Sequence, residues 1–369
     1  MLSEPVELAH ALNPTNDSER LLFRQFLETL VRIDCRGKVR PSLAQSWMAD
    51  PDGGAWTFTL REGAHFPGGA PIDPRHVASL LTSLEAKAAG IDSAMELDDR
   101  RVRVRMRQAR DTAPTVLADP ALAMLDGFAS VGDPMRKFDI PPQDGRPFIE
   151  FQLAHNGDPR DAIDRGVDLA VTRDPAVVEY VSGRPEVATY PLPWSRTYVL
   201  LQPTGARPIN RVSGVDSLRR SLAHDAVPAE ARPAELPFWS DNLATCASPA
   251  PAERQAASSS RVVYPRGDEV ARGLAERIVA LSGDAQFTAA PLAQADFAAA
   301  LRRAGERAYV VPAQRHTLNP CREAAGWPAA ASIQPLIDTR ATAIVRRGSP
   351  PLSVDWDGTI RVEDYRGAR

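Results

Sequence analysis

The chain has 369 residues, of which 43% are hydrophobic and 25% charged, and its formal net charge is −3. This is the composition of a globular protein long enough for two domains, and the small negative net charge does not suggest a phosphate-binding surface, which normally needs a basic excess. No window approaches the ~18 consecutive apolar residues of a transmembrane helix. The first residues also lack the basic and apolar regions of a secretory leader. We expect either a cytoplasmic chain or one whose leader was removed or lies upstream.

The first ninety residues predict two helices with a strand between them. Asp17 can cap a helix that continues to about Ile33, because apolar residues recur there at every third or fourth position. Residues 56–60 alternate apolar and polar side chains, which is typical of a half-buried strand. Asp73 is followed by proline and predicts the start of a second helix, which Gly90 can end.

Residues 101–107 read Arg-Val-Arg-Val-Arg-Met-Arg. The strict alternation predicts a strand with one apolar face and one arginine face. A nucleic-acid-binding strand is the alternative, but single-strand binders interleave aromatic residues with their basic ones, and none occurs here. We therefore interpret the arginine face as solvated.

The clearest unit is residues 261–312. Its pattern predicts strand, helix, strand, helix and strand, with the second strand at 286–289, and this order implies parallel strands with right-handed crossovers. Ligands in such sheets bind at the carboxyl ends of the strands. Other predicted elements are helices at 159–165 and 215–226, strands at 167–171, 186–192, 196–202, 341–346, 352–355 and 359–363, and a linker of small residues at 245–260.

Motifs for catalysis or metal binding are absent from the sequence. There is no phosphate-binding loop, no dinucleotide fingerprint and no Gly-x-Ser-x-Gly elbow, so we predict a binding protein that is not an enzyme and has no cofactor or metal. His316 and Cys321 lie five positions apart, and a soft-metal site is the alternative there. The three cysteines predict no disulfide framework, although one bridge between Cys246 and Cys321 is possible in an oxidising compartment.

Residues 18–81 contain an ordered series of distinctive segments: PSLAQSW at 41–47, WTFTLREGAHF at 56–66 and GGAP at 68–71. The series resembles the dipeptide, oligopeptide and nickel class of extracellular solute-binding proteins, called family five, of which this chain would be a shortened form. Near their mature start these proteins carry P-x-L-A-x-S-W, then F-x-L-R-x-G-v-x-F and G-x-P.

The resemblance implies an α/β fold of the two-lobed, periplasmic-binding-protein-like type II, with mixed sheets and a hinge. Lobe I would comprise residues 1–205, with a small subdomain at about 40–125. Lobe II would comprise 206–330, and 331–369 would return to lobe I.

The function implied by the resemblance is that of a solute-binding component of an ABC importer. It would capture a small, oligopeptide-like ligand between the lobes and deliver it to permease subunits, as a periplasmic or extracellular monomer, free or lipid-anchored, that binds no nucleic acid. An intracellular ligand-sensing or interaction protein on the same scaffold is the first alternative, and an unrecognised enzyme is the second.

Three segments supply the expected ligand-binding residues: Asn13, Thr15 and Asn16; Trp194, Arg196 and Tyr198; and Gln314, Arg315 and Trp327. They combine aromatic walls with polar anchors, as binding sites do. The alternative for each is an ordinary structural role: turn formation for the asparagines, core packing for the tryptophans, and solvation for the arginines.

Overall fold

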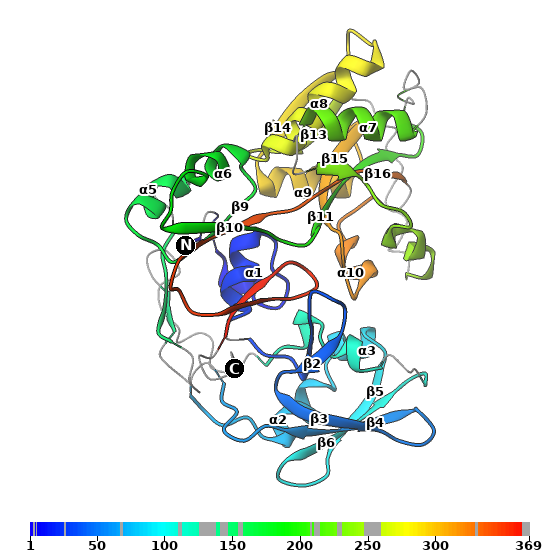
Figure 1. The fold of residues 1–369 in the computed structure, drawn as a ribbon. Coiled ribbons are helices and arrows are strands. Elements are labelled where there is room, and N and C mark those ends of the chain that lie inside the picture. Colours follow the sequence, from blue (N-terminus) through cyan, green and yellow to red (C-terminus); the bar gives the residue numbers. More distant parts are fainter. Residues whose placement is uncertain are drawn as a thin grey trace. The chain divides into compact units, whose positions relative to one another are not determined.

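The computed structural model describes residues 1–2, 4, 6–25, 27–66, 69–109, 113–124, 138–140, 147–153, 158–206, 209, 215–226, 231–246, 260–328 and 331–363. The chain forms two compact units, Met1–Leu192 with Thr342–Arg369 and Pro193–Ala341 (Figure 1). These boundaries differ from those of the predicted lobes, which lay at 205 and 330. The reason is that the strands at both ends of the second unit hydrogen-bond to each other within one sheet.

The first unit contains a four-stranded antiparallel sheet in the order β3 (Ala44–Ala49), β4 (Ala55–Leu60), β6 (Arg101–Met106) and β5 (Ile91–Glu96). Phe58, Val102 and Val104 are fully buried on its inner face. The arginines that alternate with these valines point outward, and Arg101 and Arg105 are exposed. The two strands predicted here are therefore confirmed, because alternation alone specifies which side of a strand is buried.

The helix predicted with Asp17 as its cap is shorter than expected, and its cap is Asn16 instead. Helix α1 (Asp17–Phe23) ends ten residues early, and Val31–Ile33 is strand β1, paired with β2 (Val39–Pro41). The prediction was wrong beyond Phe23 because distant residues compete for the chain there. The buried side-chain amide of Gln25 donates to the carbonyl of Ile360, in the C-terminal hairpin of β18 (Leu352–Val354) and β19 (Ile360–Val362).

A second sheet of the first unit has the order β10 (Val187–Pro191), β17 (Thr342–Arg346) and β9 (Leu169–Thr172). Helices α5 (Pro159–Asp164) and α6 (Pro175–Val181) pack against it around the buried Ile163, Val177 and Ile344. The second predicted helix is interrupted: α2 (Pro74–Leu80) is capped by Asp73 as expected, and Ser83 caps a new helix, α3 (Leu84–Ala88). The remaining elements are η1 (Leu8–His10), α4 (Ala113–Val116), η2 (Pro120–Leu122), β7 (Phe138–Ile140) and β8 (Ile149–Phe151).

The second unit is built on a six-stranded mixed sheet. Its order is β12 (Ala231–Pro233), β16 (Ala331–Thr339), β11 (Arg196–Pro203), β15 (Ala308–Gln314), β13 (Arg261–Pro265) and β14 (Thr288–Leu292). Strand β13 is parallel to β14 and β15, which confirms the predicted parallel unit, with β14 placed two to three residues later than expected.

Helices cover both faces of this sheet. Leu222 of α7 (Val215–Ala226) and Leu274 of α8 (Glu269–Ser282) share one fully buried cluster. Phe297 and Leu301 of α9 (Gln294–Arg303) belong to a second cluster on the other face, because neighbouring residues such as Val262 and Val263 alternate between the two.

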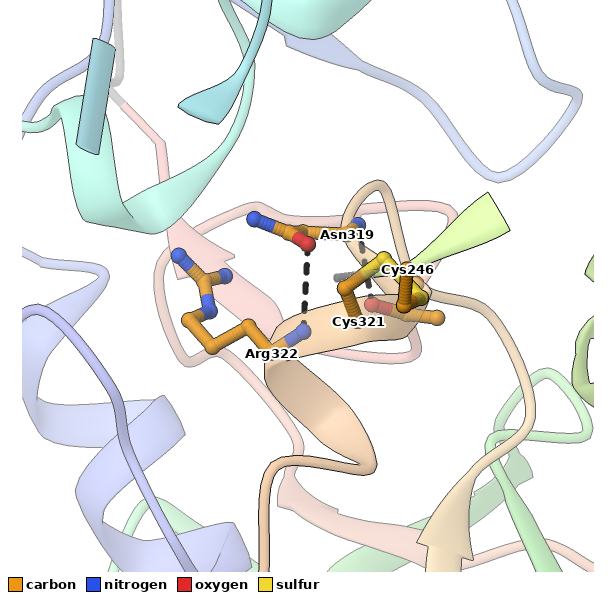
Figure 2. The surroundings of a disulfide bond; sticks show 5 residues. Cys246, Asn319, Cys321 and Arg322 are labelled. Atoms are coloured by element: carbon orange, nitrogen blue, oxygen red, sulfur yellow. Dashed lines mark hydrogen bonds between the residues drawn. A yellow bond between two sulfur atoms is a disulfide. The ribbon is translucent and has the colours of Figure 1, made fainter. Parts of the chain in front are cut away.

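A disulfide joins Cys246, just after η5 (Trp239–Thr245), to Cys321 in α10 (Pro320–Glu323), as Figure 2 shows. Its formation answers the question that the sequence left open. It also removes the Cys321 thiolate on which the alternative metal site with His316 depended. Most of the predicted linker at 245–260 lies outside the described residues. Among the helices of the described part of the chain, none is both long and apolar enough to cross a membrane.

Candidate functional site

One edge of the six-stranded sheet collects polar side chains from four strands. In the strand register Arg196, at the start of β11, lies opposite Gln314 at the end of β15 and Thr339 at the end of β16. Asp268 follows the carboxyl end of β13, and its carboxylate accepts hydrogen bonds at 3.0 Å from the Tyr198 hydroxyl. This is the strand end at which ligands bind in sheets with parallel strands.

The carboxylate of Asp338 is the centre of a charged cluster at this edge. Its side chain is fully buried and accepts hydrogen bonds from the Thr197 hydroxyl at 2.7 Å, the Glu235 backbone N–H at 3.1 Å and the Arg232 Nε at 3.3 Å. The Nε of Arg315 lies 3.5 Å from the same carboxylate. The cluster is held firmly, because a buried charge that lost its partners would be strongly destabilising.

Aromatic rings hold the guanidinium groups of the cluster in place. The Arg232 and Arg340 guanidinium carbons each lie 4.7 Å from the Trp194 ring centroid. The Arg315 guanidinium lies 5.6 Å from the Phe238 ring centroid. Stacking on an aromatic face restricts an arginine side chain while leaving its N–H edge available for a planar anion.

A second aromatic group adjoins the end of β15. The rings of Trp239 and Trp327 lie 5.3 Å apart, and the Trp239 indole N–H donates to the Gln314 carbonyl at 2.7 Å. Glu323 accepts a hydrogen bond from the Gln314 backbone N–H at 2.9 Å. Because Cys321 lies in the helix that carries Glu323, the disulfide helps to hold this aromatic group beside the strand end.

The predicted residues of the first unit are committed to local structure. Asn16 caps α1 by accepting a hydrogen bond from the Glu19 backbone N–H at 2.8 Å. The Glu19 carboxylate is almost fully buried and accepts a hydrogen bond from the Thr15 backbone N–H at 2.7 Å. The Nδ1 atom of His10 lies 2.8 Å from the same carboxylate. Asn13 is exposed in the same loop and donates its backbone N–H to the His10 carbonyl.

Beside this loop lies a shallow depression that is partly open to solvent and is lined by Pro14, Arg20 and Arg24, among others. Burial opposes the charge of Arg24, but Asp357 at 2.6 Å and Asp355 at 3.3 Å raise its pKa above the ordinary value. The arginine is therefore a permanent cation within the wall of the depression.

The structure thus places Trp194, Arg196, Tyr198, Gln314 and Arg315 at one sheet edge, with Trp327 in the adjoining aromatic group. Sequence reasoning missed Arg232, Glu235 and Asp338. Arg232 and Glu235 lie 106 and 103 positions from Asp338, and the three residues share no motif. The described residues contain no group of three His, Cys, Asp or Glu side chains placed to hold a metal ion.

Part of the chain matches a known protein family. Residues 38–148 match the model of bacterial extracellular solute-binding proteins, family 5. A segment of 69 residues is 41% identical to the nickel-binding periplasmic protein of Escherichia coli, covering 18% of this chain and 13% of that protein. A segment of 48 residues is 46% identical to the periplasmic oligopeptide-binding protein OppA of Haemophilus influenzae, covering 13% of this chain and 9% of that protein. The matched segments are thus a small part of these curated relatives.

The fold extends the likeness to almost the whole chain. NikA from Brucella suis, in complex with Fe(III)-EDTA, is 14% identical, with a TM-score of 0.65 and coverage of 96% of this chain and 97% of NikA. NikZ from Campylobacter jejuni, in complex with Ni(L-His), is 12% identical, with a TM-score of 0.65 and coverage of 96% of each chain. H. influenzae OppA, in complex with the peptide RPPGFSPFR, is 12% identical, with a TM-score of 0.60 and coverage of 92% of each chain.

These structures confirm the predicted α/β, type II periplasmic-binding-protein fold, and the family is one of solute-binding proteins that are not enzymes. The resemblance read from residues 18–81 is confirmed by a family match that overlaps it and by a fold shared over nearly the full chain. Residues 38–148 of the chain are thus similar to the bacterial extracellular solute-binding proteins of family 5, and the fold of nearly the whole chain is similar to that of NikA.

Proposed function

We propose that the protein is the solute-binding component of an ABC importer, which captures a small, oligopeptide-like ligand and delivers it to permease subunits. The observation that carries the proposal is the fold shared with NikA and OppA, whose structures hold a metal chelate and a peptide. The edge of the six-stranded sheet supports it, because it combines aromatic rings with charged groups at the strand ends where ligands bind. We propose Trp194, Arg196, Gln314 and Arg315 as its binding residues.

We further propose that the protein works in the periplasm or outside the cell, as a monomer. Both curated relatives are periplasmic by name. The disulfide between Cys246 and Cys321 supports this location, because such bridges form and persist in oxidising compartments and are rare in the cytosol.

Thermal unfolding of the purified protein against di- to pentapeptides, sugars, opines and nickel tests the proposal. A ligand at a hundred times its Kd stabilises the native state by about 2.7 kcal/mol, so the correct class raises the unfolding midpoint clearly. Trp194→Ala is expected to reduce this rise, whereas Tyr190→Ala, which removes a 56% exposed ring from the first unit, is expected to preserve it. A folded protein whose midpoint responds to none of these classes would contradict small-ligand capture.

A further inference from the structure

We propose that Arg232 and Arg315 together bind a carboxylate of the ligand, which takes the place of the Glu235 carboxylate that pairs with them in this structure. The inference rests on the proposed function and adds the chemical class of the group that is recognised. We refer to Arg232 and Arg315 as the arginine pair.

The arginine pair brings two guanidinium groups from different parts of the sheet to one point. Arg232 lies in β12 and Arg315 directly follows β15, and both approach the same oxygen of Asp338 in β16, at 3.3 and 3.5 Å. Asp338 is a fixed partner, since it is fully buried and also accepts the hydroxyl of Thr197. It neutralises one of the two positive charges.

The second positive charge is neutralised by Glu235. One of its carboxylate oxygens lies 2.7 Å from a terminal nitrogen of Arg232 and 3.8 Å from a terminal nitrogen of Arg315. Its side chain is 62% exposed, whereas that of Asp338 is 0% exposed. Exposed ion pairs contribute about 0 to 1 kcal/mol to stability, so another carboxylate can replace that of Glu235 at little cost in free energy. Replacing the buried carboxylate of Asp338 would be far more costly.

The arginine pair is also preorganised for a planar anion. Trp194 stacks with Arg232 and Phe238 with Arg315, so little side-chain freedom remains to be lost on binding. The side chain of Arg315 is 8% exposed, and its buried Nε makes no hydrogen bond. The Asp338 carboxylate, its ion-pair partner, lies 3.5 Å from this nitrogen. A guanidinium fork matches the two oxygens of a carboxylate. When Glu235 moves away, Arg232, Arg315 and Asp338 together carry a net charge of +1, which suits a ligand carboxylate.

The test is an NMR titration of the full-length protein with sodium acetate as the probe, at constant ionic strength with chloride as the balancing anion. The arginine Nε–H signals are observed, and Arg232→Lys and Arg315→Lys identify the two that belong to the arginine pair. Both substitutions keep a positive charge beside Asp338, so the buried carboxylate is not left unpaired. We expect saturable shifts of the two signals, and weaker acetate binding in each lysine variant.

Glu235→Gln is the decisive variant, because its side chain is exposed and the change does not threaten folding. We expect it to tighten acetate binding by up to about fivefold, the range that exposed ion pairs allow. The matched control is Glu62→Gln, which removes an 82% exposed carboxylate paired with Arg100 in the first unit and should leave acetate binding unchanged. Shifts that rise linearly with acetate, that chloride reproduces, or that Glu235→Gln leaves unchanged would overturn the proposal.

Failure of this inference is distinguishable from failure of the proposed function. If a ligand raised the unfolding midpoint equally with its carboxylate free and with it amidated, the result would support solute capture but contradict carboxylate recognition by the arginine pair. If acetate bound saturably at the arginine pair but none of the ligand classes changed the unfolding midpoint, the result would support the arginine pair as an anion site and contradict the proposed capture of a small ligand.

Discussion

The disulfide between Cys246 and Cys321 leads to a stability prediction whose size follows from its position. The two cysteines are 75 positions apart, and in the chain-entropy relation a loop of that length removes about 15 cal/mol/K from the unfolded ensemble. At 25 °C this corresponds to about 4.5 kcal/mol. We therefore expect Cys246→Ser with Cys321→Ser to lower the free energy of unfolding of the second unit by about 2 to 4.5 kcal/mol, since engineered and native bridges often deliver less than the relation predicts.

The loss is expected to arise mainly in the unfolded state. The contacts around the bridge do not depend on the sulfur atoms: Trp239 and Trp327 remain in ring contact, and Asn319 still caps α10 by accepting the Arg322 backbone N–H at 3.1 Å (Figure 2). The double variant should therefore keep the native tryptophan emission spectrum in the absence of denaturant, while its transition moves to lower urea concentration.

Equilibrium urea unfolding followed by tryptophan fluorescence measures the change, with and without dithiothreitol. Cys35→Ser is the matched control, because Cys35 is exposed and outside the bridge, and its transition should coincide with that of the wild type. The reasoning would be refuted if the double variant unfolded within about 1 kcal/mol of the wild type while thiol counting showed one free thiol in the denatured, unreduced wild type. Three free thiols in that sample would refute the bridge itself.

Three further predictions test other parts of the structure. Leu274→Ala should lower the free energy of unfolding, measured with urea, by about 2 to 5 kcal/mol because the Leu274 side chain is fully buried. Leu84→Ala, at a side chain that is 80% exposed, should change it by less than about 0.5 kcal/mol, and equal effects of the two variants would contradict the assigned core. The hydrogen bond from Arg40 lowers the pKa of Asp34 from 3.8 to about 2, so the stability that this interaction contributes is present above pH 3.8 and is lost as the pH falls toward 2. An NMR titration of the Asp34 carboxyl group should show a midpoint near the lowered pKa, and Arg40→Met should raise that pKa toward 3.8. Asn16→Ala should cost about 1 kcal/mol through loss of the helix cap, measured by urea unfolding, and an unchanged midpoint would contradict the capping role.

Local patterns were reliable wherever the structure depends on neighbouring residues. Asp73 followed by proline predicted the start of α2, and alternation predicted β4 and β6, because a helix cap and the two faces of a strand are properties of a few consecutive positions. The order of strands and helices in residues 261–312 predicted parallel pairing, because a helix between two strands returns the chain to the end of the sheet at which the first strand began.

Long-range contacts decided the places where local patterns failed. Apolar spacing predicted helix up to Ile33, but Gln25 hydrogen-bonds to Ile360, 335 positions away, and Val31–Ile33 pairs as a strand. Apolar spacing cannot distinguish a helix that continues from a chain that leaves the helix to meet such partners.

The amino-acid sequence by itself indicated the resemblance to family 5, through the ordered segments of residues 18–81, and with it the fold class and the expectation of solute binding. It also pointed to Arg315 and Trp194, although it could not state their partners. Only the tertiary structure brought Arg232, Glu235 and Asp338 around them and closed the disulfide between Cys246 and Cys321. The physical reason is that a charged cluster is made by the register of several strands, and register depends on the packing of the whole sheet.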